Sequence, residues 1–232
     1  MSTAASQVPG LKLGICAPAS VLYDDDVLDA ADSILARIAT FSDDGKKIEF
    51  HDLAADFIYG RRLALSHEMA KTILNRWLTR CSTATIKREK GITLEVLTAV
   101  MLSQVEGFEV RNRGISNRSQ QIDVQVHNRR THGILANSQL VFAEAKNWSN
   151  PVGTSEYYSV YRKVETTYGR SRLGFFVTTD RFTRGVRLER LKDTRHDILI
   201  VPLDRDSLPD IWRSGDDITA NVESAAIAAT GD

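Results

Sequence analysis

Residues 94 to 203 alternate between strand and helix patterns, and this alternation restricts the possible folds more than any other feature of the chain. The strand segments are short and apolar or alternating, whereas the helical segments repeat apolar residues every three or four positions. The expected segments are, in order, helix 94–104, strands 108–114, 121–126 and 140–145, helix 155–168, strand 173–179, helix 184–191 and strand 198–203. Such an order predicts an α/β sandwich with an αβββαβ core, in which the later helices cross between strands.

The N-terminal third carries a different pattern. Residues 27–38 and 66–80 have the apolar periodicity of amphipathic helices, with a short strand pattern at 47–50 between them. This order fits a winged helix-turn-helix and equally a plain helical cap. The expected parts of the chain are a mainly helical region at 1–86 that binds DNA or mediates assembly, an α/β domain at 87–212 that opens with a charged linker at 87–90, and a flexible acidic tail at 213–232.

Composition limits the class of protein. Of 232 residues 42% are hydrophobic, and 30 basic residues balance 30 acidic ones, which is typical of a folded chain and not of a disordered one. The two cysteines, Cys16 and Cys81, lack the spacing of a zinc site, and so few thiols favour a reducing compartment, with the cytoplasm as the expected location. No apolar run approaches the roughly 18 residues of a membrane span, so we expect no membrane partner.

The zero net charge is a sum of unlike segments. Residues 111–148 carry a net charge of +4 and residues 162–196 a net charge of +6, while residues 197–232 carry −6. Arginine suits phosphate because its planar fork can donate two parallel hydrogen bonds. The basic segments therefore predict a nucleic-acid surface, and RNA is not excluded. The residues expected to contact nucleic acid are Arg111, Arg113, Arg118, Arg129, Arg130, Arg181 and Arg184.

Asp123, Glu144 and Lys146 are candidate catalytic residues. Side chains alternate across a strand, so Glu144 and Lys146 share one face of the strand at 140–145 and its polar end, and Ala145 points the other way. If the strand that holds Asp123 pairs with it as a hairpin, two carboxylates and one ammonium converge at one edge of the sheet. Glu95, on the preceding helix, could add a further carboxylate, directly or through a water.

This grouping fits a divalent metal. Carboxylate oxygens from Asp123 and Glu144, with the Ala145 backbone carbonyl, form the hard-oxygen set that Mg²⁺ prefers, and Mn²⁺ is a possible substitute. A metal there polarises a phosphodiester and lowers the pKa of a bound water, and Lys146 would position or deprotonate that water or offset charge. Simpler readings stay open: Asp123 could cap a turn, Glu144 and Lys146 could form only an ion pair, and Glu95 could face solvent.

Asp123 followed by Glu144-Ala145-Lys146 resembles the PD-(D/E)XK nuclease superfamily, and most closely the Mrr-type restriction endonucleases. Further segments resemble that type over about half of the chain. Residues 91–95 resemble the helix with the glutamate, and residues 106–110 resemble the turn and strand after it. Residues 141–148 resemble the central strand, and residues 174–179 with 182–183 resemble the passage from strand to helix. Residues 199–208 resemble the closing strand. Two departures are Gln120-Gln121-Ile122 in place of a glycine-rich approach, and Glu144 where many members carry glutamine.

The resemblance implies a restriction-endonuclease-like fold and a Mg²⁺-dependent endonuclease that hydrolyses DNA to 5′-phosphate and 3′-hydroxyl ends. Asp123, Glu144, Lys146 and Glu95 would be the catalytic residues. A role in restriction or anti-phage defence and a homodimer are further expectations from the resemblance. Two alternatives remain, a catalytically silent module that binds DNA or a partner, and a nuclease effector that a sensor protein activates within a defence complex.

Overall fold

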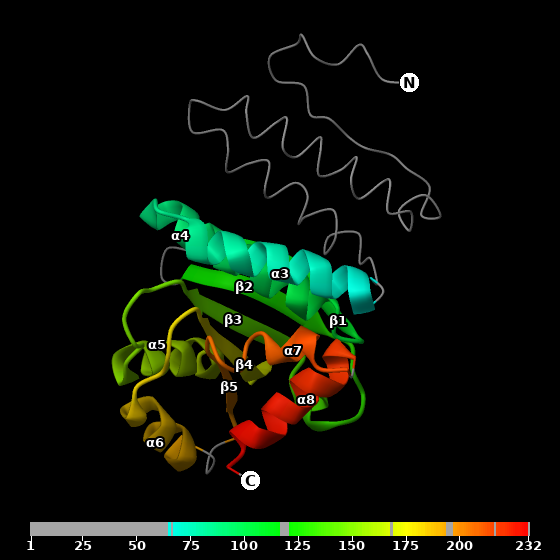
Figure 1. The fold of residues 1–232 in the computed structure, drawn as a ribbon. Coiled ribbons are helices and arrows are strands. Elements are labelled where there is room, and N and C mark those ends of the chain that lie inside the picture. Colours follow the sequence, from blue (N-terminus) through cyan, green and yellow to red (C-terminus); the bar gives the residue numbers. More distant parts are fainter. Residues whose placement is uncertain are drawn as a thin grey trace. The chain divides into compact units, whose positions relative to one another are not determined.

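Five strands form one mixed sheet whose order across the sheet is the order along the chain, β1-β2-β3-β4-β5 (Figure 1). The computed structural model describes residues 65, 67–116, 121–167, 169–193, 197–215 and 217–231, with the side chains of residues 69, 112–116, 121 and 190–193 outside that description. The strands are β1 (Phe108–Ser116), β2 (Gln121–Asn128), β3 (Leu140–Lys146), β4 (Ser171–Thr178) and β5 (Leu199–Leu203). Strand β2 is antiparallel to both β1 and β3, and β3, β4 and β5 run parallel to one another. The α/β class and the order of strands are therefore confirmed.

Helices cover both faces of this sheet (Figure 1). Parallel strands need a crossover, which α5 and α6 supply between β3, β4 and β5. Strand β3 is buried on both faces: Val141 and Ala143 belong to the core cluster with α4 and α8, and Phe142 belongs to the cluster with α5 and α6. The helices are α3 (His67–Thr83), α4 (Lys87–Ser103), α5 (Thr154–Glu165), α6 (Arg184–Asp193), α7 (Asp210–Arg213) and α8 (Ile218–Ala229), with a short 3₁₀ turn η2 (Ile134–Asn137).

The predicted domain boundary at residue 86 is wrong. Helices α3 and α4 lie on either side of that boundary and belong to the same compact unit, Asp52–Asp232. Leu74 of α3 is fully buried in the same core cluster as Leu94 of α4, because the apolar stripe of each helix faces the other. The residues predicted as a charged linker are the first turn of α4. The helix predicted at 27–38 and the rest of the winged-helix pattern lie outside the described residues.

The predicted flexible acidic tail is also wrong, because α8 occupies most of it. Asp217 begins this helix by accepting a hydrogen bond from the backbone N–H of Ala220 at 2.8 Å. Ile218, Val222 and Ala226 recur every four residues on one face and are buried. Composition suggested a polar tail, whereas the spacing of these few apolar residues makes an amphipathic helix that joins the core.

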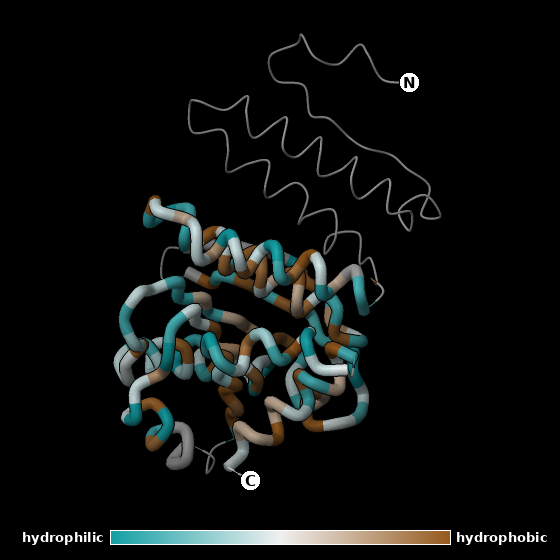
Figure 2. The backbone as a smooth tube through the Cα atoms, viewed as in Figure 1, coloured by the Kyte–Doolittle hydropathy of each residue, from teal (hydrophilic) through white to brown (hydrophobic). Residues whose placement is uncertain are grey.

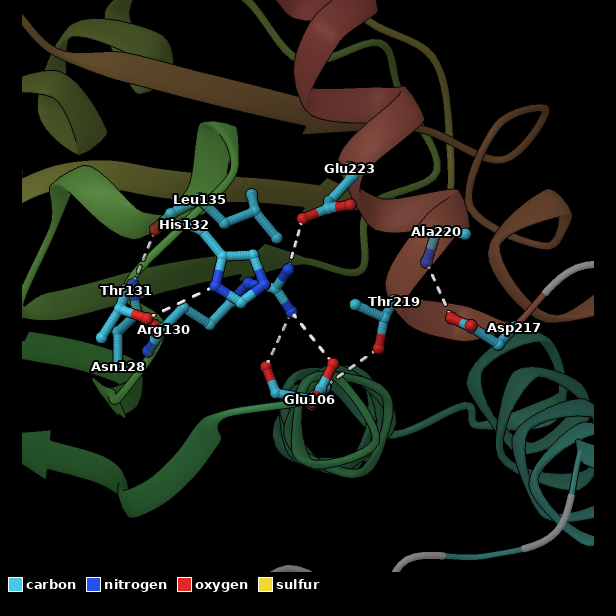
Figure 3. Close-up of polar contacts among 10 residues, drawn as sticks. All are labelled: Glu106, Asn128, Arg130, Thr131, His132, Leu135, Asp217, Thr219, Ala220 and Glu223. Atoms are coloured by element: carbon cyan, nitrogen blue, oxygen red, sulfur yellow. Dashed lines mark hydrogen bonds and ion pairs between the residues drawn. The ribbon is translucent and has the colours of Figure 1, made fainter.

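Arg130 connects α8 to the β1–β2 layer (Figure 3). Its guanidinium forms an ion pair with Glu223 of α8 and donates a hydrogen bond to the backbone carbonyl of Glu106 at 3.0 Å. The backbone N–H of Glu106 in turn donates to the hydroxyl of Thr219 at 2.9 Å. Only 7% of the Arg130 side chain is exposed. The prediction that Arg130 contacts nucleic acid is therefore not supported, since the guanidinium is buried and its two terminal nitrogens bond Glu223 and Glu106.

Hydrophobic and hydrophilic segments alternate along the helices, and the strands carry much of the hydrophobic sequence (Figure 2). This is the pattern of helices that bury one face against a sheet. Within the ranges that the structure describes, no helix combines the length and the apolar character needed to cross a lipid bilayer.

Candidate active site

The hairpin of β2 and β3 brings Asp123 beside Glu144, as predicted. The antiparallel pairing places Val124 opposite Ala143, so Asp123 lies one position further along, level with Glu144 and on the same face of the sheet. Asp123 Oδ2 accepts a hydrogen bond from the backbone N–H of Ala145 at 2.9 Å. Both carboxylates are buried, with 4% of Asp123 and 7% of Glu144 exposed.

Two lysines hold the carboxylate of Glu144. Lys146, two residues along β3 and on the same face, donates from Nζ to Glu144 Oε1 at 2.6 Å. Lys163, on α5, donates from Nζ to Glu144 Oε2. Ala145 points to the opposite face and packs in the core. The predicted convergence of Asp123, Glu144 and Lys146 is thus what the structure shows, with a second ammonium added.

Sequence reasoning missed Lys163, although the helix pattern contained a signal. Tyr157, Val160 and Val164 form the buried face of α5, and Lys163 follows Val160 by three positions. A lysine at the border of a buried helical face can lay its stem along apolar neighbours and reach a distant carboxylate with its ammonium. The periodicity could mark the position, but it could not name Glu144 as the partner.

Burial and charge shift the proton affinities in the site. Burial raises the pKa of Asp123 above its usual range, and the neighbouring charge of Glu144 raises it further, against smaller opposing effects of the Ala145 N–H and the two lysines. Burial by itself lowers the pKa of Lys146, but the contact with Glu144 and two further carboxylates outweigh it, so the pKa lies above its ordinary value. Lys146 is therefore an ammonium at neutral pH, which favours donating a hydrogen bond over abstracting a proton.

Glu95 is one of the carboxylates that raise the pKa of Lys146, which places its charge near the site. Among the described residues, however, no group of three or more His, Cys, Asp and Glu side chains is arranged to hold a metal ion. Glu95 is on α4, which packs on the face of the sheet that carries Val141 and Ala143, so a direct bond to the metal stays a prediction. A role through a bridging water stays a prediction.

The donor set fits a divalent cation. Two buried carboxylates lie side by side, and the raised pKa of Asp123 reflects burial and repulsion that a bound cation would offset. Ala145 follows Glu144 along β3, and its backbone N–H donates to Asp123 Oδ2, so its backbone lies beside the carboxylate pair. A cation could bind Glu144 only if an ammonium group moved, because both oxygens of Glu144 already accept hydrogen bonds from Lys146 and Lys163.

Asn147 fixes the end of β3 at this edge of the sheet. Its Nδ2 donates to the backbone carbonyls of Cys81 and Lys90, both at 2.9 Å. Its Oδ1 accepts a hydrogen bond from the hydroxyl of Thr179 at 2.6 Å. One side chain thus ties α3, α4 and the exit of β4 to the residue that follows Lys146. No sequence spacing indicated this role.

The predicted basic residues divide between the two ends of the sheet. Arg111 and Arg129 form ion pairs with Glu109, whose partner in the β1–β2 ladder is His127, four residues along β2 from Asp123. They therefore lie toward the end of β2 that is remote from the carboxylates. The side chains of Arg113 and Arg118 are outside the described part of the chain.

Arg181 and Arg184 lie at the edge that carries the site. They follow β4, whose last residue Thr178 pairs with Lys146, and both are exposed. A bridge between Val152 and Phe182 brings the loops after β3 and β4 together. Arg181 forms an ion pair with Asp206 at 3.4 Å, so Arg184 is the better placed of the two for a phosphate.

No family model matches the sequence, and no curated protein matches it. Among solved structures, a repair endonuclease from Pyrococcus abyssi is similar over 53% of this chain and 49% of its own, with 17% sequence identity and a TM-score of 0.35. The chain thus spans about half the length of that endonuclease.

Proposed function

We propose that this protein is a metal-dependent endonuclease that hydrolyses phosphodiester bonds in DNA. The observation that carries the proposal is the burial of Asp123 and Glu144 side by side, with the ammonium of Lys146 on the same face. Burying two carboxylates costs free energy in a protein whose stability is marginal, so their retention at a sheet edge favours a functional reason. The resemblance to PD-(D/E)XK nucleases and the Mrr type supports the same activity.

Asp123 and Glu144, with the Ala145 carbonyl, would hold Mg²⁺ or Mn²⁺. When bound, the metal supplies Lewis acidity toward a phosphate oxygen and an activated water. Attack of the water oxygen on phosphorus breaks the bond to the 3′ oxygen, leaving a 5′-phosphate and, after protonation, a 3′-hydroxyl. Because Lys146 is held as an ammonium, we assign it to the phosphate oxygen that gains negative charge.

Lys146→Met tests this assignment. We expect the metal-dependent cleavage of plasmid and linear DNA to fall about 100-fold, the scale seen when one preorganised donor to a developing charge is removed. Lys87→Met is the matched control, because Lys87 is an exposed lysine at the start of α4. Equal rates for wild type and Lys146→Met would contradict the assignment. Parallel assays on RNA identify the nucleic acid that is cut.

Arg184 is proposed to contact the DNA backbone. We expect Arg184→Ala to weaken binding of duplex DNA regardless of sequence and to lower the slope of log K against log salt by about 1, as loss of one phosphate contact does. Arg111→Ala is the control, since Arg111 is paired with Glu109 toward the remote end of β2. The measurement is a fluorescence anisotropy titration in EDTA at several salt concentrations. A loss of affinity shared by both variants would argue against a localised contact.

A silent binding module is the second candidate. The observation in its favour is that Lys146 and Lys163 already neutralise Glu144 without a metal. Such a protein would bind DNA, with or without Mg²⁺, and would not cut it. Cleavage that needs a second protein would instead indicate an effector within a complex. The defence role, the homodimer and the cytoplasmic location follow only from the resemblance and composition, and remain proposals.

A further inference from the structure

Glu144 is the most constrained side chain of the site. Its two carboxyl oxygens hold two ammonium groups that arrive from different elements, Lys146 from β3 and Lys163 from α5. The exposed fractions of the two lysine side chains are 25% and 15%. With Asp123 nearby, two buried carboxylates and two ammonium groups meet on this face of the sheet without any metal.

A divalent cation cannot be added to this arrangement without a change of partners. Two like charges a few ångströms apart repel strongly inside a protein, where the effective dielectric constant is about 20 and not the 80 of water. A metal on Glu144 therefore competes with an ammonium on the same carboxylate. The question becomes which of the two lysines gives way.

The geometry distinguishes them. Lys146 sits two residues from Glu144 on the same strand face, and the strand is fixed by Asn147, so its ammonium remains close to the carboxylate in any rotamer that points across this face. Lys163 reaches across from a helix on a flexible four-carbon stem, and Lys and Arg side chains readily change direction in this way. Lys163 can therefore leave Glu144 by turning its own stem and withdraw to α5, whereas Lys146 stays within reach of the carboxylate.

We propose that Lys163 is a positioning residue that occupies Glu144 Oε2 in the metal-free protein and competes there with the divalent cation. This inference rests on the proposed function, because it requires Glu144 to be a metal ligand. In the metal-free protein Lys163 keeps a buried carboxylate paired. On metal binding its ammonium leaves that oxygen, and the measured metal affinity is lowered by the cost of breaking the pair.

The test is the affinity of the full chain for Mn²⁺, measured by electron paramagnetic resonance without DNA. We expect Lys163→Met to bind Mn²⁺ roughly ten-fold more tightly than wild type, the scale expected when a charge-assisted hydrogen bond no longer has to be broken. Lys163→Arg keeps the cation and should retain the wild-type affinity. Lys87→Met, which removes an exposed lysine of α4, should also leave the affinity unchanged.

A second readout separates competition from damage to the fold. In EDTA, Lys163→Met should melt below wild type, because Glu144 Oε2 has lost its partner, and saturating Mn²⁺ should recover more of the melting temperature in the variant than in wild type. If Lys163→Met does not fold, Lys163→Gln is measured against the same criteria. A substitution that merely loosened the structure would weaken metal binding.

The outcomes are distinguishable. If wild type binds Mn²⁺ and the folded Lys163 variants bind it equally or more weakly, the competition is refuted and the proposed function stands. If neither wild type nor any Lys163 variant binds Mn²⁺, the proposed metal site is refuted and the competition falls with it. Binding by Lys163→Met where wild type shows none is the extreme form of the expected result.

Discussion

Asp123→Asn is expected to lower metal-dependent DNA cleavage about 1,000-fold, at the upper end of what the loss of one preorganised electrostatic group costs. The same substitution should raise the melting temperature in EDTA. Asparagine has nearly the same shape, and its side-chain oxygen can still accept the hydrogen bond from the Ala145 N–H. What it removes is a buried negative charge beside Glu144. Opposite changes in activity and stability are the signature of a functional carboxylate.

The pH dependence of stability carries the same information. Burial and Glu144 raise the pKa of Asp123 in the folded protein above its unfolded value of about 3.9. The protonated form is therefore favoured by folding, so the Asp123 contribution is fully present below pH of about 3.9 and is lost as pH rises through the folded pKa. In EDTA, wild type should lose stability over this interval relative to Asp123→Asn.

The control for Asp123→Asn is Asp197→Asn. Asp197 precedes β5 at the opposite end of the parallel strands, and 86% of its side chain is exposed. Cleavage rates and urea denaturation with and without Mg²⁺ give both readouts, and Asp197→Asn should match wild type in each. Wild-type cleavage by Asp123→Asn would remove the proposed metal site, whatever its effect on stability.

The carboxylate pair could be predicted because it follows from local rules. Strand alternation places Glu144 and Lys146 on one face, and antiparallel pairing of adjacent apolar strands brings Asp123 level with Glu144. These are short-range consequences of sequence. The partner of Lys163 and the backbone carbonyls that Asn147 binds depend on how the helices pack on the sheet. The spacing of residues 144, 147 and 163 along the chain does not predict that packing.

The positions of the arginines could not be predicted from the sequence either. Charge counted along the chain grouped Arg130 with Arg184, although one is buried against α8 and the other is exposed after β4. The net charge of a segment does not show which of its arginines form ion pairs with nearby carboxylates and which stay available for phosphate. The C-terminal segment differs from the arginines, because the four-residue spacing of Ile218 and Val222 does predict a helix although the segment is polar and acidic in composition.

Truncating the chain after residue 216 is expected to destabilise it severely. The truncation removes Ile218 and Val222, whose burial contributes about 1.5–3 kcal/mol each, from a domain with a total stability of about 5–15 kcal/mol. It also deprives the buried Arg130 guanidinium of Glu223. We expect the melting temperature to fall by at least about 10 °C, given about 2–4 °C per kcal/mol for a chain of this size, or cooperative unfolding to disappear.

A chain that ends at Thr230 is the matched control, because it keeps α8 and its buried face intact. Arg130→Met removes the ion pair with Glu223 and the hydrogen bond to the Glu106 carbonyl but keeps an apolar stem, so we expect a loss of about 1–3 kcal/mol with no change in the salt slope of DNA binding. Calorimetry and anisotropy titrations measure the two effects. An unchanged melting temperature for the truncated chain would instead support the flexible acidic tail that composition predicts. Loss of the thermal transition would establish α8 as part of the core that the fold requires.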